Sequence, residues 1–162
     1  MSDRSGSHAV VRRLVSGGQT GVDRAALDAA MSLGIPCGGW CPRGRRAEGG
    51  PIPHHYPVQE APTSSYPQRT AWNVRDSDGT LIVTRGVPKG GTALTVSLAR
   101  RGGKPFFVLD LDGRPLVSEV VEWIGHEEVR TLNVAGPRES EAPGIHDQAL
   151  AFLRVLLSLP GG

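Results

Sequence analysis

Apolar residues along this chain alternate between short continuous runs and stripes at helical spacing. Between the runs, apolar residues recur every three or four positions, which predicts helices over residues 24–33, 92–100, 116–124 and 145–157. The runs themselves have the length of strands and cover residues 10–15, 36–40, 80–84, 106–109 and 129–134. Strands that alternate with helices predict an α/β fold with a parallel sheet and helices on both of its faces.

One segment interrupts this alternation. Residues 41–65 are rich in proline, glycine and arginine and contain no apolar run of strand length. A loop of this length inside a compact domain usually has a function. The chain length suits one domain, which we place over residues 10–162, and the polar residues 1–9 are predicted to be a disordered N-terminus.

Composition excludes several classes of protein. The formal net charge is +2 over 162 residues, and no basic run is interleaved with aromatic residues, so we expect no nucleic-acid partner. No apolar stretch reaches 18 residues and the N-terminus lacks a signal-like segment, so we expect no membrane partner and a cytoplasmic location. Two cysteines suit free thiols in a reducing compartment.

Three predicted strand-to-helix loops share one construction: small residues, free backbone donors and a helix start. They cover residues 17–23, 86–92 and 133–140. Such loops meet at one edge of a parallel sheet, where the N–H groups of new helices favour an anion. The candidate ligand-binding residues in these loops are Gly17, Gly18, Gln19, Thr20, Gly21, Asp23, Lys89, Gly90, Gly91, Thr92, Gly136, Arg138, Glu139 and Ser140.

Each of these loops also has a simpler interpretation. Glycine commonly ends a strand, so any one loop could be an ordinary turn. The first loop is neither a dinucleotide fingerprint nor a Walker loop, because the required spacings are absent. Thr20 and Asp23 fit a capping box, in which the carboxylate would stabilise the helix without a ligand. Alternatively, Asp23 orients a donor group of the bound ligand.

Two further groups of polar side chains are candidates for the same site. Arg43, Arg45 and Arg46 in the long loop could capture a phosphate, or they could form a solvated basic loop. Arg69, Asn73 and Asp76 recur at helical spacing, so one polar face could point to the sheet edge, or simply to solvent. We interpret Trp72, on the same segment, as a core residue.

Metal and catalytic sites receive little support. Cys37 and Cys41 have C-x3-C spacing, but a zinc site would require His54 and His55 as well, so a buried thiol and a loop thiol are favoured. No Ser-His-Asp set or carboxylate pair can be assembled. The helix after Gly91-Thr92 carries no acid, which disfavours a hydrolase and favours a binding protein.

These motifs together resemble the molybdenum cofactor carrier family, over about residues 14–157. That family belongs to a superfamily of Rossmann-like proteins that also contains the lysine-decarboxylase-like phosphoribohydrolases. The resemblance rests on residues 16–26, 39–48, 69–80, 90–92 and 133–140. In the phosphoribohydrolases the second loop reads Pro-Gly-Gly-x-Gly-Thr and is followed by acids; here Pro88-Lys89-Gly90-Gly91-Thr92 keeps the shape and lacks the acids.

The resemblance implies a Rossmann-like three-layer sandwich with a mostly parallel central sheet of about five to seven strands. It also implies a homo-oligomer, a dimer or tetramer, that carries the molybdenum cofactor as cargo, with molybdoenzymes as acceptors. The phosphate of this phosphorylated pterin would lie on the glycine loops. Two alternatives stay open: a nucleotide or nucleoside-phosphate hydrolase that uses Asp23 or Glu139, and a sensor of a nucleotide-derived ligand.

Overall fold

The computed structural model describes residues 11–160 as an α/β sandwich built on a parallel five-stranded sheet. The strand order is β2-β1-β7-β5-β6. The strands are β1 (Arg13–Val15), β2 (Cys37–Gly38), β5 (Gly79–Thr84), β6 (Phe106–Asp110) and β7 (Thr131–Ala135). The predicted α/β class, the parallel sheet and the Rossmann-like architecture are thereby confirmed. The predicted N-terminal segment, residues 1–9, lies outside the described residues.

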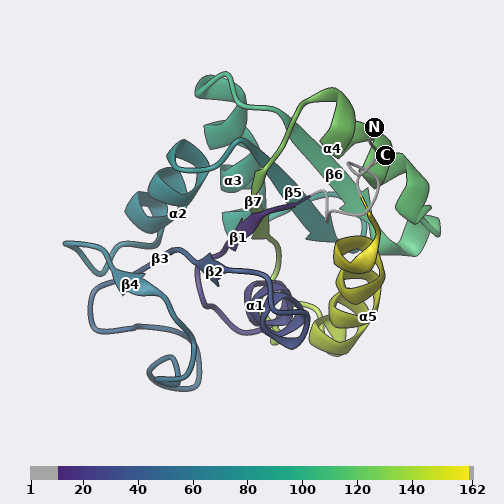
Figure 1. Cartoon of the computed structure of the whole chain (residues 1–162). Coiled ribbons are helices and arrows are strands. Elements are labelled where there is room, and N and C mark those ends of the chain that lie inside the picture. Colours follow the sequence, from purple (N-terminus) through teal and green to yellow (C-terminus); the bar gives the residue numbers. More distant parts are fainter. Residues whose placement is uncertain (1–10, 161–162) are drawn as a thin grey trace.

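Helices cover both faces of this sheet (Figure 1). On one face α1 (Val22–Ser32) packs against α5 (Ile145–Ser158), and α4 (Val117–His126) also contacts α5. On the other face α2 (Tyr66–Arg75) packs against α3 (Gly90–Arg101). A 3-10 turn, η2 (Leu111–Gly113), follows β6. Within residues 11–160, no helix is long and apolar enough to cross a membrane.

Apolar burial explains why these runs form the central strands. Leu14, Leu81 and Leu132 are fully buried on β1, β5 and β7, and every residue of β5 is buried. Leu14 stands in register with Cys37 on one side and Leu132 on the other. Burial of each leucine side chain contributes about 1.5–3 kcal/mol to the stability of the fold. These three leucines therefore hold the central strands of the sheet together.

The predicted strand over residues 36–40 is divided between two sheets. Gly39 breaks it with a φ of 127°, and a Cβ there would lie 2.2 Å from the carbonyl oxygen of Ser16. After this glycine the chain leaves the main sheet and forms β3 (Trp40–Cys41), which pairs in parallel with β4 (Gln59–Glu60). The long loop that we predicted without strands therefore carries a small sheet of its own.

The last strand of the chain occupies the middle of the sheet. β7 lies between β1 and β5 and pairs with both in parallel. When the strands are renumbered from β7, the order β2-β1-β7-β5-β6 becomes 3-2-1-4-5, which is that of the nucleotide-binding doubly wound fold. The connections reverse direction between β7 and β5, and such folds bind ligands outside the strand ends at this point.

Candidate functional site

A cavity of about 100 Å³, open to solvent, lies at the carboxyl ends of β1 and β7 and beside the start of α3. The enclosed volume would hold several water molecules or one phosphate-sized group, and a larger ligand would extend from it through the open side. The predicted residues that line it are Gly17, Gln19, Asp23, Arg69, Asn73, Gly91, Thr92, Gly136 and Arg138. The three loops and α2 therefore share one site.

A buried ion pair forms one wall of the cavity. Arg69 Nη1 lies 3.1 Å from Asp23 Oδ2, and the two side chains are only 11% and 6% exposed. The backbone N–H of Gln19 also donates to Asp23 Oδ2, at 3.2 Å. Burial raises the pKa of the Asp23 carboxyl, and the Arg69 guanidinium opposes this shift. Removal of either partner would leave an uncompensated buried charge.

Arg69 also has a buried donor with no partner in the described part of the chain. Its Nε is buried and has no hydrogen-bond partner among residues 11–160. A buried donor without a partner costs about 1–3 kcal/mol, and more when it belongs to a charged group. An anion or a water molecule in the cavity would relieve this cost.

Gly17 allows the guanidinium of Arg69 to reach its position. A Cβ at Gly17 would lie 1.5 Å from Arg69 Nη1, so any side chain there would occupy the place of the guanidinium. Glycine at position 17 therefore makes room for the Arg69–Asp23 ion pair, and the same residue lines the cavity.

Other glycines at the site differ in what surrounds them. A Cβ at Gly136 would lie 2.2 Å from the Val83 carbonyl oxygen, and one at Gly21 would lie 2.4 Å from the Pro137 carbonyl oxygen. These two glycines permit close packing of backbone. Gly91, which lines the cavity, has no atom within 4 Å of the corresponding Cβ position. Glycine at position 91 therefore keeps space open rather than filling a tight contact.

Arg138 and Glu141 contribute the second pair of charges that lines the cavity. Arg138 Nε lies 3.6 Å from Glu141 Oε1, and both side chains are partly exposed. Because exposed ion pairs of this kind contribute little stability, a ligand can displace Glu141 from Arg138 at small cost. The cavity therefore has one fixed guanidinium, Arg69, and one adjustable guanidinium, Arg138.

Three predicted residues join loops to one another beside the cavity. The hydroxyl of Thr20 donates to Glu48 Oε2 and accepts from the backbone N–H of Glu139. Ser140 donates to the same carboxylate through its hydroxyl, at 2.6 Å, and through its backbone N–H. Glu139 instead accepts from the N–H groups of Gly144 and His146 at the start of α5. None of the three lines the cavity.

The expected capping box does not form. Helix α1 begins after Gly21, and no side chain caps it. The Asp23 carboxylate accepts from Gln19, as described above, while Thr20 turns to Glu48. The positive φ of Gly21, 79°, lets the chain enter the helix without a side-chain cap.

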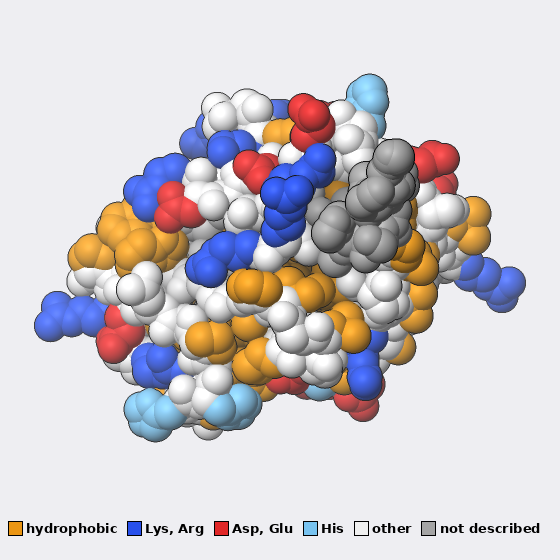
Figure 2. Space-filling view, viewed as in Figure 1, with side chains coloured by type: hydrophobic (Ala, Val, Ile, Leu, Met, Phe, Trp, Pro, Cys, Tyr) orange, Lys and Arg blue, Asp and Glu red, His pale blue; other side chains and the backbone are white. Residues whose placement is uncertain are grey.

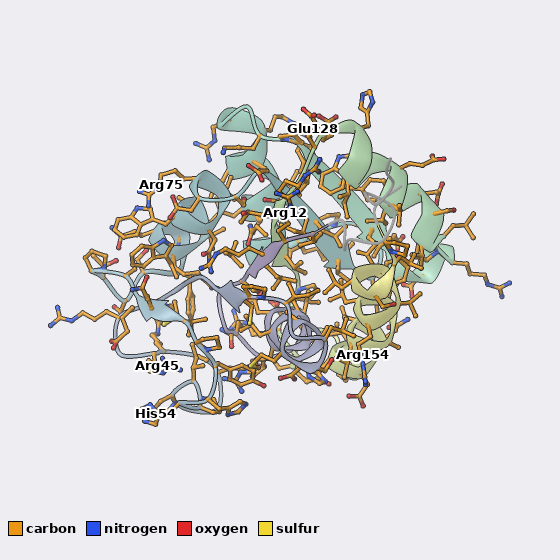
Figure 3. The ribbon with its side chains drawn as sticks, viewed as in Figure 1. Arg12, Arg45, His54, Arg75, Glu128 and Arg154 are labelled. Atoms are coloured by element: carbon orange, nitrogen blue, oxygen red, sulfur yellow. The ribbon has the colours of Figure 1, made fainter. Side chains whose placement is uncertain are left out.

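None of the three arginines of the long loop lines the cavity, although Arg46 lies over the ring of Tyr66, which does. The guanidinium of Arg45 donates to four backbone carbonyls of its own loop, those of Ile52, Pro53, Tyr56 and Val58. Figure 3 shows Arg45 within this loop, near His54. Arg43 is exposed, and Arg46 donates to the carbonyl of Ser64. Arg45 therefore orders the loop.

The remaining predicted residues divide between structural and exposed positions. Asn73 lines the cavity but uses its amide to pair with the backbone of Trp40, at 2.8 and 3.0 Å. Asp76 accepts from Trp40 Nε1 and pairs with Arg75, outside the cavity. The Gly18 carbonyl accepts from Arg24 Nε. Lys89 and Gly90 are exposed at the start of α3 and do not line the cavity.

Some lining residues were not among the predicted ones. They are Tyr66, Thr70, Leu94, Thr95, Asn133, Val134, Ala135 and Glu141. Two signals could have identified part of this set. Tyr66 and Thr70 share a helix face with Arg69 and Asn73, and Asn133 is a polar residue within an apolar strand, where it is buried and donates to Thr80 Oγ1.

Both cysteines are free thiols on strands: Cys41 is buried on β3, as one of the two was expected to be, and Cys37 is partly buried on β2, so neither is a loop thiol. Burial raises the pKa of both thiols. Within the described part of the chain, no group of three or more His, Cys, Asp or Glu side chains could hold a metal ion.

Trp72, which we expected in the core, is partly exposed and packs edge-on against Trp40 at 4.9 Å. On the face seen in Figure 2, basic side chains are interspersed with acidic and apolar ones.

Comparison with known proteins agrees with the fold. A family model described as the circularly permutated YpsA SLOG family matches residues 14–157. The chain is also similar to a crystal structure of a "putative molybdenum carrier protein" from Syntrophus aciditrophicus SB. That likeness has a TM-score of 0.88 and 45% identity, and it covers 93% of this chain and 97% of the other. Among curated proteins, none matches the chain.

The match to a permutated family agrees with the strand order, in which the last strand takes the place of a first one. The resemblance to molybdenum cofactor carriers is confirmed by the family model and by the similar structure. The chain therefore belongs to the circularly permutated YpsA SLOG family, among the proteins related to molybdenum cofactor carriers.

Proposed function

We propose that this chain is a carrier that binds the molybdenum cofactor as cargo, with the phosphate of the pterin held at the glycine loops. The observation that carries this proposal is the buried Nε of Arg69, which has no partner in the described residues and belongs to a wall of the cavity. The open space beside Gly91 lies in the same cavity. The name of the similar structure, a molybdenum carrier protein, supports the choice of cargo.

The two carboxylates that the hydrolase alternative would use, Asp23 and Glu139, are both engaged, which favours binding over hydrolysis. Asp23 is paired with Arg69, and Glu139 is hydrogen-bonded to the start of α5, so neither carboxylate is free to activate water. A general base must lie within hydrogen-bond reach of the proton it removes. A nucleotide-derived ligand would use the same phosphate contacts, and cargo identity is therefore what the experiment has to decide.

The residues fit a phosphorylated pterin by their chemistry. Guanidinium groups at Arg69 and Arg138 suit a phosphate, which they can bind with two parallel hydrogen bonds. The N-terminus of α3 adds the positive end of a helix. We further propose that the protein assembles as a homo-oligomer and passes its cargo to molybdoenzymes.

A retention experiment tests the carrier. Cofactor released from a molybdoenzyme under anoxic conditions is mixed with the purified protein and passed through a desalting column, and molybdenum per protein chain is then measured. We expect retention by the wild type and by Arg75→Ala, a control on the same helix with its charge outside the cavity. Arg69→Lys and Gly91→Val should retain at least tenfold less.

Two outcomes would reject the carrier. The first is a wild-type protein that retains no molybdenum and fails to protect the cofactor from oxidation. The second is retention that is equal in the wild type, Arg69→Lys and Gly91→Val, since the cargo would then lie elsewhere. Light scattering on the same samples tests the homo-oligomer, because a monomer at all concentrations would exclude it.

A further inference from the structure

The cavity has a second end with a different chemistry from the glycine loops. It continues between α2 and α3, where Tyr66, Thr70, Leu94 and Thr95 line it. The hydroxyl of Thr70 donates to the Tyr66 carbonyl at 2.9 Å, and that of Thr95 donates to the Gly91 carbonyl at 3.1 Å. Because both threonine hydroxyls donate within their own helices, this end offers the Leu94 side chain and the Tyr66 ring rather than free threonine donors.

Tyr66 provides a flat aromatic surface at this end. The guanidinium carbon of Arg46 lies 4.3 Å from the centroid of the Tyr66 ring, and that of Arg69 lies 5.5 Å from it. Arg46 is an exposed residue of the long loop, and its guanidinium donates a hydrogen bond to the carbonyl of Ser64. The Tyr66 ring thus already accommodates a planar cationic group that can be moved aside.

Arg69 connects the two ends of the cavity, and this limits which ligands can bind. Arg69 belongs to both, since its guanidinium pairs with Asp23 beside the glycine loops and also lies near the Tyr66 ring. A ligand whose phosphate is held by Arg69 therefore has the next part of its structure beside Tyr66. Aromatic side chains bind flat heterocycles by stacking, which contributes about 1–3 kcal/mol per ring.

We infer that Tyr66 is the stacking surface for the fused planar ring of a phosphorylated heterocycle, whose phosphate lies at the glycine loops. This inference rests on the proposed function for the phosphate end and assigns the class of ligand at the other end. Pterins and purines share the required chemistry, namely a flat nitrogen-containing ring joined to a phosphate. Tyr66 is thus a specificity-determining residue, which separates ring-bearing phosphates from simple ones.

Calorimetric titrations with three probes test this assignment: 6-hydroxymethylpterin phosphate, guanosine 5′-monophosphate and ribose 5-phosphate. The variants are Tyr66→Leu, which keeps bulk and removes the aromatic ring, and Tyr66→Phe, which keeps the ring. We expect Tyr66→Leu to weaken the better ring-bearing probe about tenfold and to leave ribose 5-phosphate within about twofold. Tyr66→Phe should bind all three probes within about twofold of the wild type. Thermal melting shows that each variant is folded.

The outcomes separate this inference from the proposed function. If Tyr66→Leu weakens ring-bearing and ring-free phosphates equally, or neither, Tyr66 is not a stacking surface and the inference is wrong, whatever the retention experiment gives. If the guanosine probe binds at least tenfold better than the pterin probe and depends on Tyr66, the stacking surface is supported and the molybdenum cargo is rejected. Failure of all three probes to bind the wild type overturns the inference.

Discussion

Gly136 and Gly91 line the same cavity, and alanine at these two positions should have opposite effects on stability. At Gly136 the new Cβ would lie 2.2 Å from the Val83 carbonyl oxygen and 2.6 Å from Val22 Cγ2. The first contact is with the backbone of β5, which is buried at every position and cannot move aside. Overpacking of this kind costs about 1–3 kcal/mol, and contact with backbone places it near the upper end.

At Gly91 the same substitution meets no atom within 4 Å. Gly91 is the second residue of α3, and its backbone is not in the left-handed region. Alanine in a helix is favoured over glycine by about 0.5–1 kcal/mol because the unfolded chain loses less freedom on folding. Gly91→Ala should therefore be neutral or slightly stabilising, although its methyl group projects into open space at the cavity.

Thermal melting and urea unfolding followed by tryptophan fluorescence measure both effects. For a domain of this size, 1 kcal/mol shifts Tm by about 2–4 °C. We expect Gly136→Ala to lower Tm by roughly 6–10 °C and Gly91→Ala to leave it unchanged or raise it by about 1–3 °C. In the phosphate-probe titrations, Gly91→Ala should still bind more weakly than the wild type. A Gly136→Ala protein that melts within 2 °C of the wild type, or a Gly91→Ala protein that melts clearly lower, would refute the reasoning.

Three further predictions concern charged side chains. Asp23→Ala should destabilise the fold by about 3 kcal/mol or more because Arg69 loses its buried partner. In urea unfolding, the double variant Asp23→Ala with Arg69→Met should recover part of this loss. Additive effects of the two substitutions would contradict the pairing. Arg45→Met should cost roughly 2–3 kcal/mol and make the long loop sensitive to limited proteolysis, whereas Arg43→Met should do neither. Burial lowers the pKa of His146, but hydrogen bonds to Asp147 and Asp28 outweigh it, so the pKa is raised overall. The stabilisation that protonated His146 contributes is complete below the unfolded pKa, about 6.5, and is lost as pH rises through the folded pKa. Urea unfolding should therefore show the stability of the wild type falling over this pH range. A His146→Gln variant with an unchanged pH dependence would disprove this prediction.

The sequence was sufficient for the fold because burial and periodicity agree along most of the chain. The runs that became β5 and β6 contain continuous apolar stretches, β7 places the buried Leu132 and Val134 on either side of Asn133, and the stripes that became α1, α3, α4 and α5 repeat at helical spacing. The strand at residues 36–40 was the exception. Its pattern is apolar throughout, and only the close approach of Gly39 to Ser16 divides it, which no local pattern reveals.

At the site, sequence reasoning found the loops but could not assign the partner of each side chain. Glycines that keep a cavity open, such as Gly91, look the same in sequence as glycines that allow tight packing, such as Gly136. Arg45 and Arg69 are equally charged, yet one binds loop carbonyls and the other a buried carboxylate. These outcomes depend on contacts between residues far apart in the chain, and local spacing does not contain them.

The central position of β7 has a consequence for synthesis on the ribosome. Ser16 at the end of β1 donates to the carbonyl of Val134 in β7, a contact between residues 118 positions apart. Chains fold from the N-terminus as they emerge, so β1 and β5 present open edges until β7 arrives, and such edges are prone to aggregation. The cavity wall at residues 133–136 is made by the same late segment. Loading of a ligand therefore has to wait until residues 133–140 have been synthesised, and a chain that stops before them would have neither a continuous sheet nor a complete site.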